Sequence, residues 1–168
     1  MREAVIVSTA RTPIGKAYRG SFNNLASPTL AGHAISAAVQ RAGIEPDRIE
    51  DCIMGAALTQ GSQGGNIGRT AALRAGLPVT VSGMTIDRQC SSGMMAVATA
   101  AKQVLHDGMD AVVGGGVESI SLVQNEHMNL HRAADEELLA MHKDIYMPML
   151  QTAEVVAARY NVSRDAMD

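Results

Sequence analysis

Short apolar runs alternate with longer amphipathic stretches along the first two thirds of the chain. Continuous apolar runs of this length are typical of strands buried on both faces, and they predict strands at residues 4–8, 51–55, 82–86 and 110–114. The intervening patterns predict helices from Ser27 to the stop at Gly43, from about 66 to 75, and from about 91 to 106. This alternation of strand and helix predicts an α/β fold with a mostly parallel, mixed sheet and helices on both faces.

Two helix patterns carry further information. Ser27 followed by Pro28 predicts an N-cap and a first helical residue. The helix expected over 91–106 is small and apolar on nearly every side, which predicts that it is covered on both faces. Its own sheet would cover one face, and no second sheet for the other is evident in the sequence.

The character of the chain changes after Ser119, where charge, methionine and histidine become more frequent and strand patterns end. Helices are expected at about 133–141 and 151–160, with a turn and a new N-cap at 161–163. We therefore expect an α/β domain over 1–119 and the beginning of a mainly helical domain over 120–168. The uncovered helix and the helix cut short near Asp168 predict an N-terminal fragment of a longer protein.

Composition excludes several functional classes. The chain is 46% hydrophobic and 18% charged with a net charge of −3, so no basic surface for nucleic acid or anionic membranes is expected. No apolar stretch is long enough for a membrane span, and no secretion signal is evident. The two cysteines lie in dissimilar contexts and do not form a disulfide framework, which favours a reducing compartment and a cytoplasmic location.

Cys90 is the strongest candidate for chemistry. It follows the strand expected at 82–86 and precedes the helix that begins near Ser91. The positive end of a helix dipole favours the thiolate, which is the nucleophilic form, and the first-turn N–H groups could hold an oxyanion. The alternative is an inert structural cysteine, as we expect for Cys52 within its apolar run.

Other clusters favour structural roles. The glycines at 61–68 and 114–116 match neither a dinucleotide fingerprint nor a phosphate loop, and they indicate tight turns and close packing. His127 and His131 would share a helix face, but a zinc site needs further ligands, so exposed histidines are the better interpretation. No metal site is expected. The methionines at 147–150 fill core gaps or, less often, line an acyl-binding wall.

Taken in order, the motifs resemble those of the N-terminal half of a thiolase of the 3-ketoacyl-CoA thiolase or acetyl-CoA acyltransferase type. The segment Asp87-Arg88-Gln89-Cys90-Ser91-Ser92-Gly93 is similar to the family's active-site cysteine segment. The other matching segments are 5–8 with 11–16, 41–44, 53–55, 69–73, 75–78, 113–119 and 152–157. Asp87 departs from the pattern, because many members have Asn there.

The resemblance implies an acyltransferase that uses coenzyme A as a substrate and needs no cofactor or metal. Cys90 would attack the 3-keto carbon of a 3-ketoacyl-CoA, and a second CoA would release the shortened acyl-CoA. Its own backbone N–H would donate to the thioester oxygen. The Pro148-Met149 pair is more similar to the degradative branch, and Met149 is a candidate substrate-binding residue. A homodimer or homotetramer is implied.

The family's general-base histidine, its water-orienting asparagine and its second cysteine belong to a C-terminal domain that these 168 residues lack. The chain alone is therefore expected to be inactive. Three alternatives stay open: another cysteine-dependent condensing enzyme that uses an acyl carrier protein, a non-catalytic scaffold subunit, and a redox-sensing thiol protein.

Overall fold

The computed structural model describes residues 2–168, which form two compact units. The first ends at Met128 and the second is Asn129–Asp168. The first unit thus continues past residue 119, where we expected the boundary. The reason is the short helix α4 (Ile120–Val123), whose Val123 is buried and lies beside Gly61 in the turn η2 (Gly61–Gln63).

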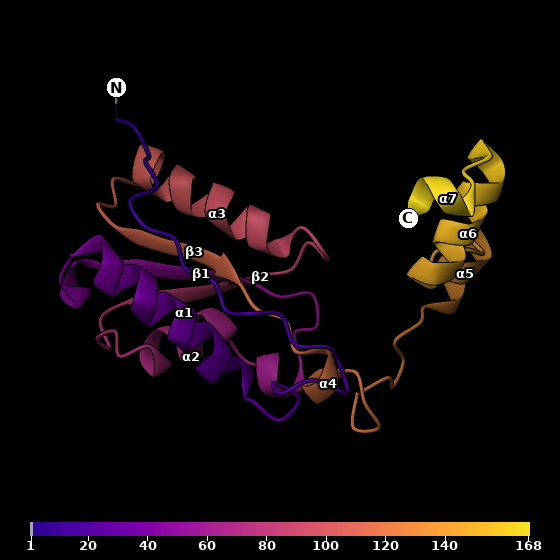
Figure 1. The fold of residues 1–168 in the computed structure, drawn as a ribbon, viewed down its shortest axis with the longest axis horizontal. Helices are drawn as coiled ribbons and strands as arrows, with labels where there is room; N and C mark the ends of the chain where they lie inside the picture. The colour runs from indigo at the N-terminus through magenta and orange to yellow at the C-terminus, as the bar shows by residue number, and fades with distance from the viewer. Residues whose placement is uncertain (1) are drawn as a thin grey trace. The chain divides into compact units, whose positions relative to one another are not determined.

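A parallel sheet of three strands lies at the centre of the first unit (Figure 1). Its strands are β1 (Asp51–Gly55), β2 (Ser82–Ile86) and β3 (Val112–Gly116), arranged in the order β2-β1-β3. Asp51 lies opposite Ser82 and Val112 in the two registers. The first two strands confirm the prediction. The third strand runs over 112–116 and not 110–114, and Asp110 lies ahead of it with its carboxylate beside Arg2 and Arg48.

Helices cover both faces of this sheet (Figure 1). Alternate residues of a strand point to opposite faces: Cys52 and Met54 join the core with α1 (Ser27–Ala42) and α2 (Ile67–Arg74), while Ile53 packs with Ala96 and Ala100 of α3 (Ser92–Lys102). This arrangement confirms the α/β fold with helices on both faces. The described strands are all parallel.

After α3 the helix widens into a π-helical turn, Gln103–Asp107, and this turn ends at Gly108 in the left-handed conformation. Only the sheet-facing side of α3 is buried; Met94, on another side, is 78% exposed. The expectation that this helix is covered on both sides is therefore not met within residues 2–168.

The strand expected at 4–8 is absent, which corrects the sequence prediction. Residues 4–8 have no strand assignment, and Val5, Ile6 and Val7 are each more than 70% exposed. An apolar run becomes a strand only when another strand supplies backbone partners, and none of β1, β2 and β3 pairs with it. Side-chain contacts hold its ends instead, since Arg41 donates to the carbonyl of Thr9.

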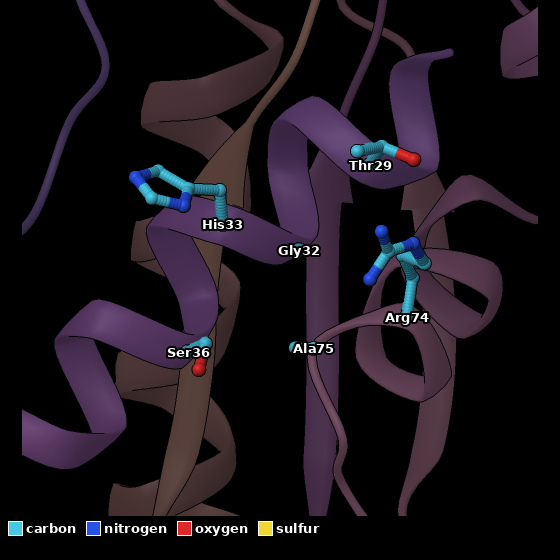
Figure 2. A pocket seen from close by; sticks show the side chains of 6 residues that line it. All are labelled: Thr29, Gly32, His33, Ser36, Arg74 and Ala75. Atoms are coloured by element: carbon cyan, nitrogen blue, oxygen red, sulfur yellow. The ribbon is translucent and has the colours of Figure 1, made fainter.

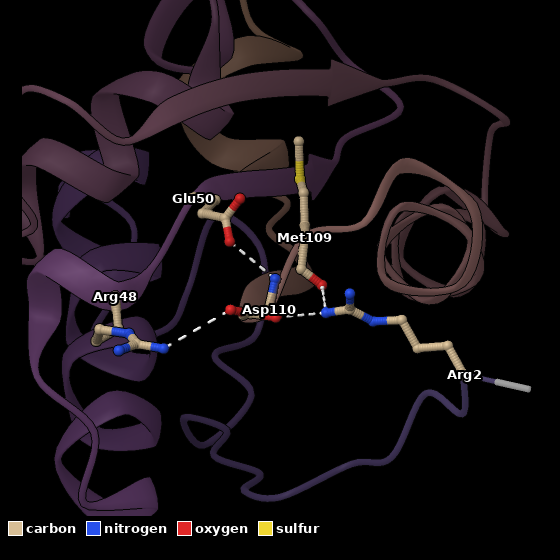
Figure 3. A network of polar contacts seen from close by, with 5 residues as sticks. All are labelled: Arg2, Arg48, Glu50, Met109 and Asp110. Atoms are coloured by element: carbon tan, nitrogen blue, oxygen red, sulfur yellow. Dashed lines mark hydrogen bonds and ion pairs between the residues drawn. The ribbon is translucent and has the colours of Figure 1, made fainter.

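Arg2 anchors the start of this segment in a polar network (Figure 3). Its guanidinium donates to the Met109 carbonyl and to the Asp110 carboxylate. Arg48, the last residue of the 3₁₀ turn η1 (Pro46–Arg48), lies 3.7 Å from the same carboxylate, and Glu50 accepts the Asp110 N–H at 2.8 Å. These contacts join the N-terminal segment to the residues that precede β1 and β3.

The N-cap of α1 is Ala26 and not Ser27, which corrects a second prediction. Ser27 is fully buried, and its hydroxyl donates to Gln63 at 3.4 Å, so it serves a tertiary contact in place of a cap. Asn66 caps α2 by accepting the Arg69 N–H.

The second unit contains α5 (Glu136–Met141), α6 (Met149–Tyr160) and α7 (Arg164–Met167). Asp135 caps α5, so this helix starts three residues later than predicted, and α6 starts two residues earlier. Asn161 ends α6 in the left-handed conformation and Ser163 caps α7, as the turn at 161–163 predicted. No helix within residues 2–168 is both long and apolar enough to cross a membrane.

Candidate active site

Cys90 lies on the turn that joins β2 to α3, at the carboxyl-terminal end of the parallel strands, which is called the sheet edge below. Its side chain is exposed in the part of the chain that the structure describes. The helix begins at Ser92 with Ser91 as its N-cap, so Cys90 precedes the first helical residue by two positions. The predicted strand–cysteine–helix junction is therefore present, with the thiol just ahead of the first turn.

The turn before Cys90 has an uncommon backbone. Gln89 has a φ of 49°, in the left-handed region that non-glycine residues seldom adopt. The Asp87 carboxylate accepts the Gln89 N–H at 2.8 Å. An asparagine at position 87 would offer the same kind of acceptor oxygen. The hydrogen bond to the Gln89 N–H is therefore possible with either residue at this position.

Two adjacent serines close the turn in different ways. The exposed Ser91 hydroxyl donates to the Arg88 carbonyl at 2.8 Å. The Ser92 side chain is 2% exposed; its hydroxyl accepts the Arg88 N–H at 2.8 Å and donates to the Gln89 carbonyl at 2.5 Å. Sequence reasoning missed this difference, because nothing in the pair Ser-Ser indicates which hydroxyl faces inwards.

Glycines allow the start of α3 to touch the ends of β1 and β3. A Cβ on Gly55 would lie 2.2 Å from the carbonyl carbon of Ser92, and one on Gly116 would lie 3.1 Å from the Cα of Gly93. The backbone of the cysteine turn thus rests directly on the sheet. The prediction that the 114–116 glycines serve close packing agrees with this contact, although they lie in β3 and not in a turn.

A polar cluster holds the loop after β1 at the same edge of the sheet. The Glu118 carboxylate accepts the N–H groups of Ala57 at 2.8 Å and Leu58 at 3.3 Å, together with the side-chain amide of Gln63. Gln63 is 1% exposed, and its carbonyl oxygen accepts the Ser119 N–H. The glycine-rich sequence around Gln63 carried no signal for this role.

Cys52 confirms the contrast expected between the two cysteines. Its side chain is fully buried among the residues under α1 and α2. Burial, reinforced by the nearby Asp51 carboxylate, raises the pKa of the Cys52 thiol to about 12. Cys52 is therefore a protonated core residue at neutral pH.

The other candidate residues lie on other segments of the chain. Met149 is the first residue of α6 in the second unit and is 72% exposed. His127 and His131 lie outside any helix, and the His127 imidazole lies 3.6 Å from the Glu126 carboxylate. Within residues 2–168 no group of three or more histidine, cysteine or acidic side chains is arranged to hold a metal ion.

Two hollows on the first unit lie away from Cys90. One, of about 270 Å³, lies between α1 and the end of α2, where His33 and Arg74 line its walls (Figure 2). The other, of about 410 Å³, is lined by residues 9–11 and Arg41. Cys90 is not among the residues that line either hollow.

Comparison with known proteins places these features in a family. The family model described as "Thiolase, N-terminal domain" matches residues 4–168. A 3-ketoacyl-CoA thiolase of Bacillus subtilis (strain 168) is 40% identical over 100% of this chain and 42% of its own length. An acetyl-CoA acetyltransferase of Cupriavidus necator is 38% identical over 100% of this chain and 45% of its own length.

The fold agrees with the sequence comparison. The crystal structure of the Bacillus anthracis acetyl-CoA acetyltransferase superposes with a TM-score of 0.81 at 34% identity, covering 98% of this chain and 43% of that chain. The chain thus spans less than half the length of the curated relatives it matches. With the parallel sheet, the cysteine turn at its edge and a match over 4–168, the chain belongs to the thiolase family as an N-terminal domain.

Proposed function

We propose that this chain supplies the nucleophile of a thiolase that transfers acyl groups to and from coenzyme A. The exposed Cys90 on its strand-to-helix turn is the observation that carries the proposal. Relatives named 3-ketoacyl-CoA thiolase and acetyl-CoA acetyltransferase support the substrate class.

In the proposed reaction the Cys90 thiolate attacks the 3-keto carbon of a 3-ketoacyl-CoA. The bond between C2 and C3 breaks, acetyl-CoA leaves, and the acyl group remains on the sulfur as a thioester. The thiolate of a second CoA then takes the acyl group and regenerates Cys90. The Cys90 N–H is proposed to donate to the thioester oxygen during both steps.

Coenzyme A is the substrate in this scheme, and no metal or further cofactor takes part. The proton transfers need an acid and a base that residues 1–168 are not expected to provide, since the sequence holds no Gly-His-Pro segment. We therefore expect a 168-residue preparation to lack thiolysis activity. Met149 stays a proposed contributor to acyl-chain binding.

The homo-oligomer and the cytoplasmic location also stay predictions. Relatives include bacterial proteins and peroxisomal 3-ketoacyl-CoA thiolases of Arabidopsis thaliana and Mus musculus, so the family occurs in more than one compartment. Sedimentation of the full-length protein and microscopy of a tagged copy would test the two predictions.

The decisive experiment is the intact mass of the full-length protein after incubation with acetyl-CoA, followed by peptide mapping. Acetylation at Cys90, abolished in Cys90→Ala, is the expected result. An unmodified Cys90 would refute the proposal and favour a scaffold role. Oxidation of Cys90 by peroxide without any acylation would favour a redox sensor, and acylation only from an acyl carrier protein would favour another condensing enzyme.

A further inference from the structure

We infer that Ser92 is a positioning residue that sets the direction of the Cys90 backbone N–H. The inference rests on the proposed function, because it concerns the same nucleophile. It starts from one buried hydroxyl that holds two peptide groups on the N-terminal side of Cys90: it accepts the Arg88 N–H and donates to the Gln89 carbonyl.

The Gln89 carbonyl and the Cys90 N–H belong to one peptide unit. That unit is planar and trans, so its C=O and N–H point in opposite directions. The Ser92 hydroxyl holds the carbonyl oxygen at 2.5 Å, and the Ser92 N–H donates to the same oxygen at 3.0 Å. Fixing the oxygen therefore fixes the direction in which the Cys90 N–H points.

The backbone needs this restraint because Gln89 is in the left-handed region at a φ of 49°. Such a conformation persists in a non-glycine residue only where surrounding contacts hold it. The Asp87 carboxylate holds the Gln89 N–H, and Ser92 holds its carbonyl. The two side chains restrain opposite ends of the residue that precedes the nucleophile.

Ser92 is itself fixed by the sheet. Its carbonyl carbon lies against Gly55 at the end of β1, and its side chain is buried. Because the Ser92 hydroxyl is shielded from water and held in place, the orientation of the Gln89–Cys90 peptide is set before substrate binds. Preorganised donors of this kind stabilise charge that develops on a carbonyl oxygen.

The neighbouring Ser91 provides a matched control. Its hydroxyl donates to the Arg88 carbonyl, which also accepts the Ser91 N–H at 3.2 Å, so removing the hydroxyl leaves that carbonyl with a partner. Removing the Ser92 hydroxyl takes away the acceptor of the Arg88 N–H and leaves the Gln89 carbonyl with the Ser92 N–H in place of two donors. The two serines are adjacent and chemically identical, and only the inward one acts on the Cys90 peptide.

The test compares Ser92→Ala, Ser92→Thr and Ser91→Ala in the full-length protein. Acetylation of Cys90 by acetyl-CoA is followed by mass spectrometry, giving a rate constant at saturation and a half-saturating concentration. Alkylation of Cys90 by iodoacetamide and circular dichroism report whether the turn is folded and accessible, since alkylation needs no oxyanion donor.

For Ser92→Ala we expect roughly a tenfold to hundredfold lower rate constant at saturation, because the donor is misdirected but not removed. Its half-saturating concentration, alkylation rate and circular dichroism should stay within about twofold of wild type. Ser92→Thr, which keeps a hydroxyl, should recover most of the rate, and Ser91→Ala should match wild type.

The inference is overturned if wild type is acetylated and Ser92→Ala is acetylated equally fast. It is also overturned if the acetylation rate constant falls as far in Ser91→Ala as in Ser92→Ala, or if Ser92→Thr recovers none of the lost rate. Loss of the fold in Ser92→Ala would overturn it as well. Failure of the proposed function looks different, because then the wild-type protein itself carries no acetyl group on Cys90.

Discussion

Replacing Gly55 with alanine tests whether the sheet edge positions the cysteine turn. The added Cβ would lie 2.2 Å from the Ser92 carbonyl carbon and 2.4 Å from the Gly93 nitrogen. Ordinary contact begins near 3.4 Å, so the start of α3 has to move by about 1.2 Å, the difference between these distances. Both neighbours are backbone atoms, so no side-chain rotation can relieve the overlap.

This displacement has an expected size in two measurements. Forcing extra volume into a packed site costs about 1–3 kcal/mol in the free energy of unfolding. A shift of about 1 Å in a reacting group can lower its rate on the order of 100-fold. We therefore expect Gly55→Ala in the full-length protein to unfold at lower urea and to acetylate Cys90 far more slowly than wild type.

Gly115→Ala is the matched control, one strand away. Its Cβ would meet only the side chain of Met54, at 3.4 Å from the sulfur, and that side chain is flexible. We expect Gly115→Ala to change both measurements little. The reasoning is wrong if Gly55→Ala acetylates Cys90 as fast as wild type, or if the two alanine variants lose rate and stability to the same extent.

Three further predictions concern buried and strained residues. Because the folded-state pKa of Cys52 is raised to about 12, its stabilising contribution is fully present below pH 9 and is lost as pH rises towards 12. In urea unfolding, wild type should lose up to about 1.4 kcal/mol per pH unit relative to Cys52→Ala. A difference in unfolding free energy that does not change with pH would contradict this. Gln63→Leu leaves the buried Ser119 N–H unpaired and should lower the free energy of unfolding by roughly 1–3 kcal/mol in the same assay. Gln40→Leu, at an exposed position, should stay within about 0.5 kcal/mol of wild type, and equal losses of stability would refute the role of the Gln63 amide. Gln89→Val places a β-branched residue at a φ of 49° and should cost about 1–3 kcal/mol, while Gln89→Asn should be nearly neutral; a neutral valine variant would show that the turn relaxes.

The sequence alone determined the elements whose signals are local. Apolar runs located β1 and β2 with correct ends, and periodicity with a terminal glycine located α1. The segment around Cys90 predicted the strand-to-helix junction, and the ordered series of short motifs along the chain carried the resemblance to the family. Local backbone preference and hydrophobic period are properties of neighbouring residues, so they can be read without the fold.

The tertiary structure decided what depends on distant partners. The apolar run at 4–8 was expected to be a strand, yet no described strand pairs with it. Ser27 had the sequence of a cap but is turned towards Gln63. Ser91 and Ser92 are indistinguishable in sequence, and only the fold buries Ser92, whose backbone lies against Gly55, and leaves Ser91 exposed. Pairing, burial and close approach are made by residues far apart in the chain, and they exist only once the sheet has formed.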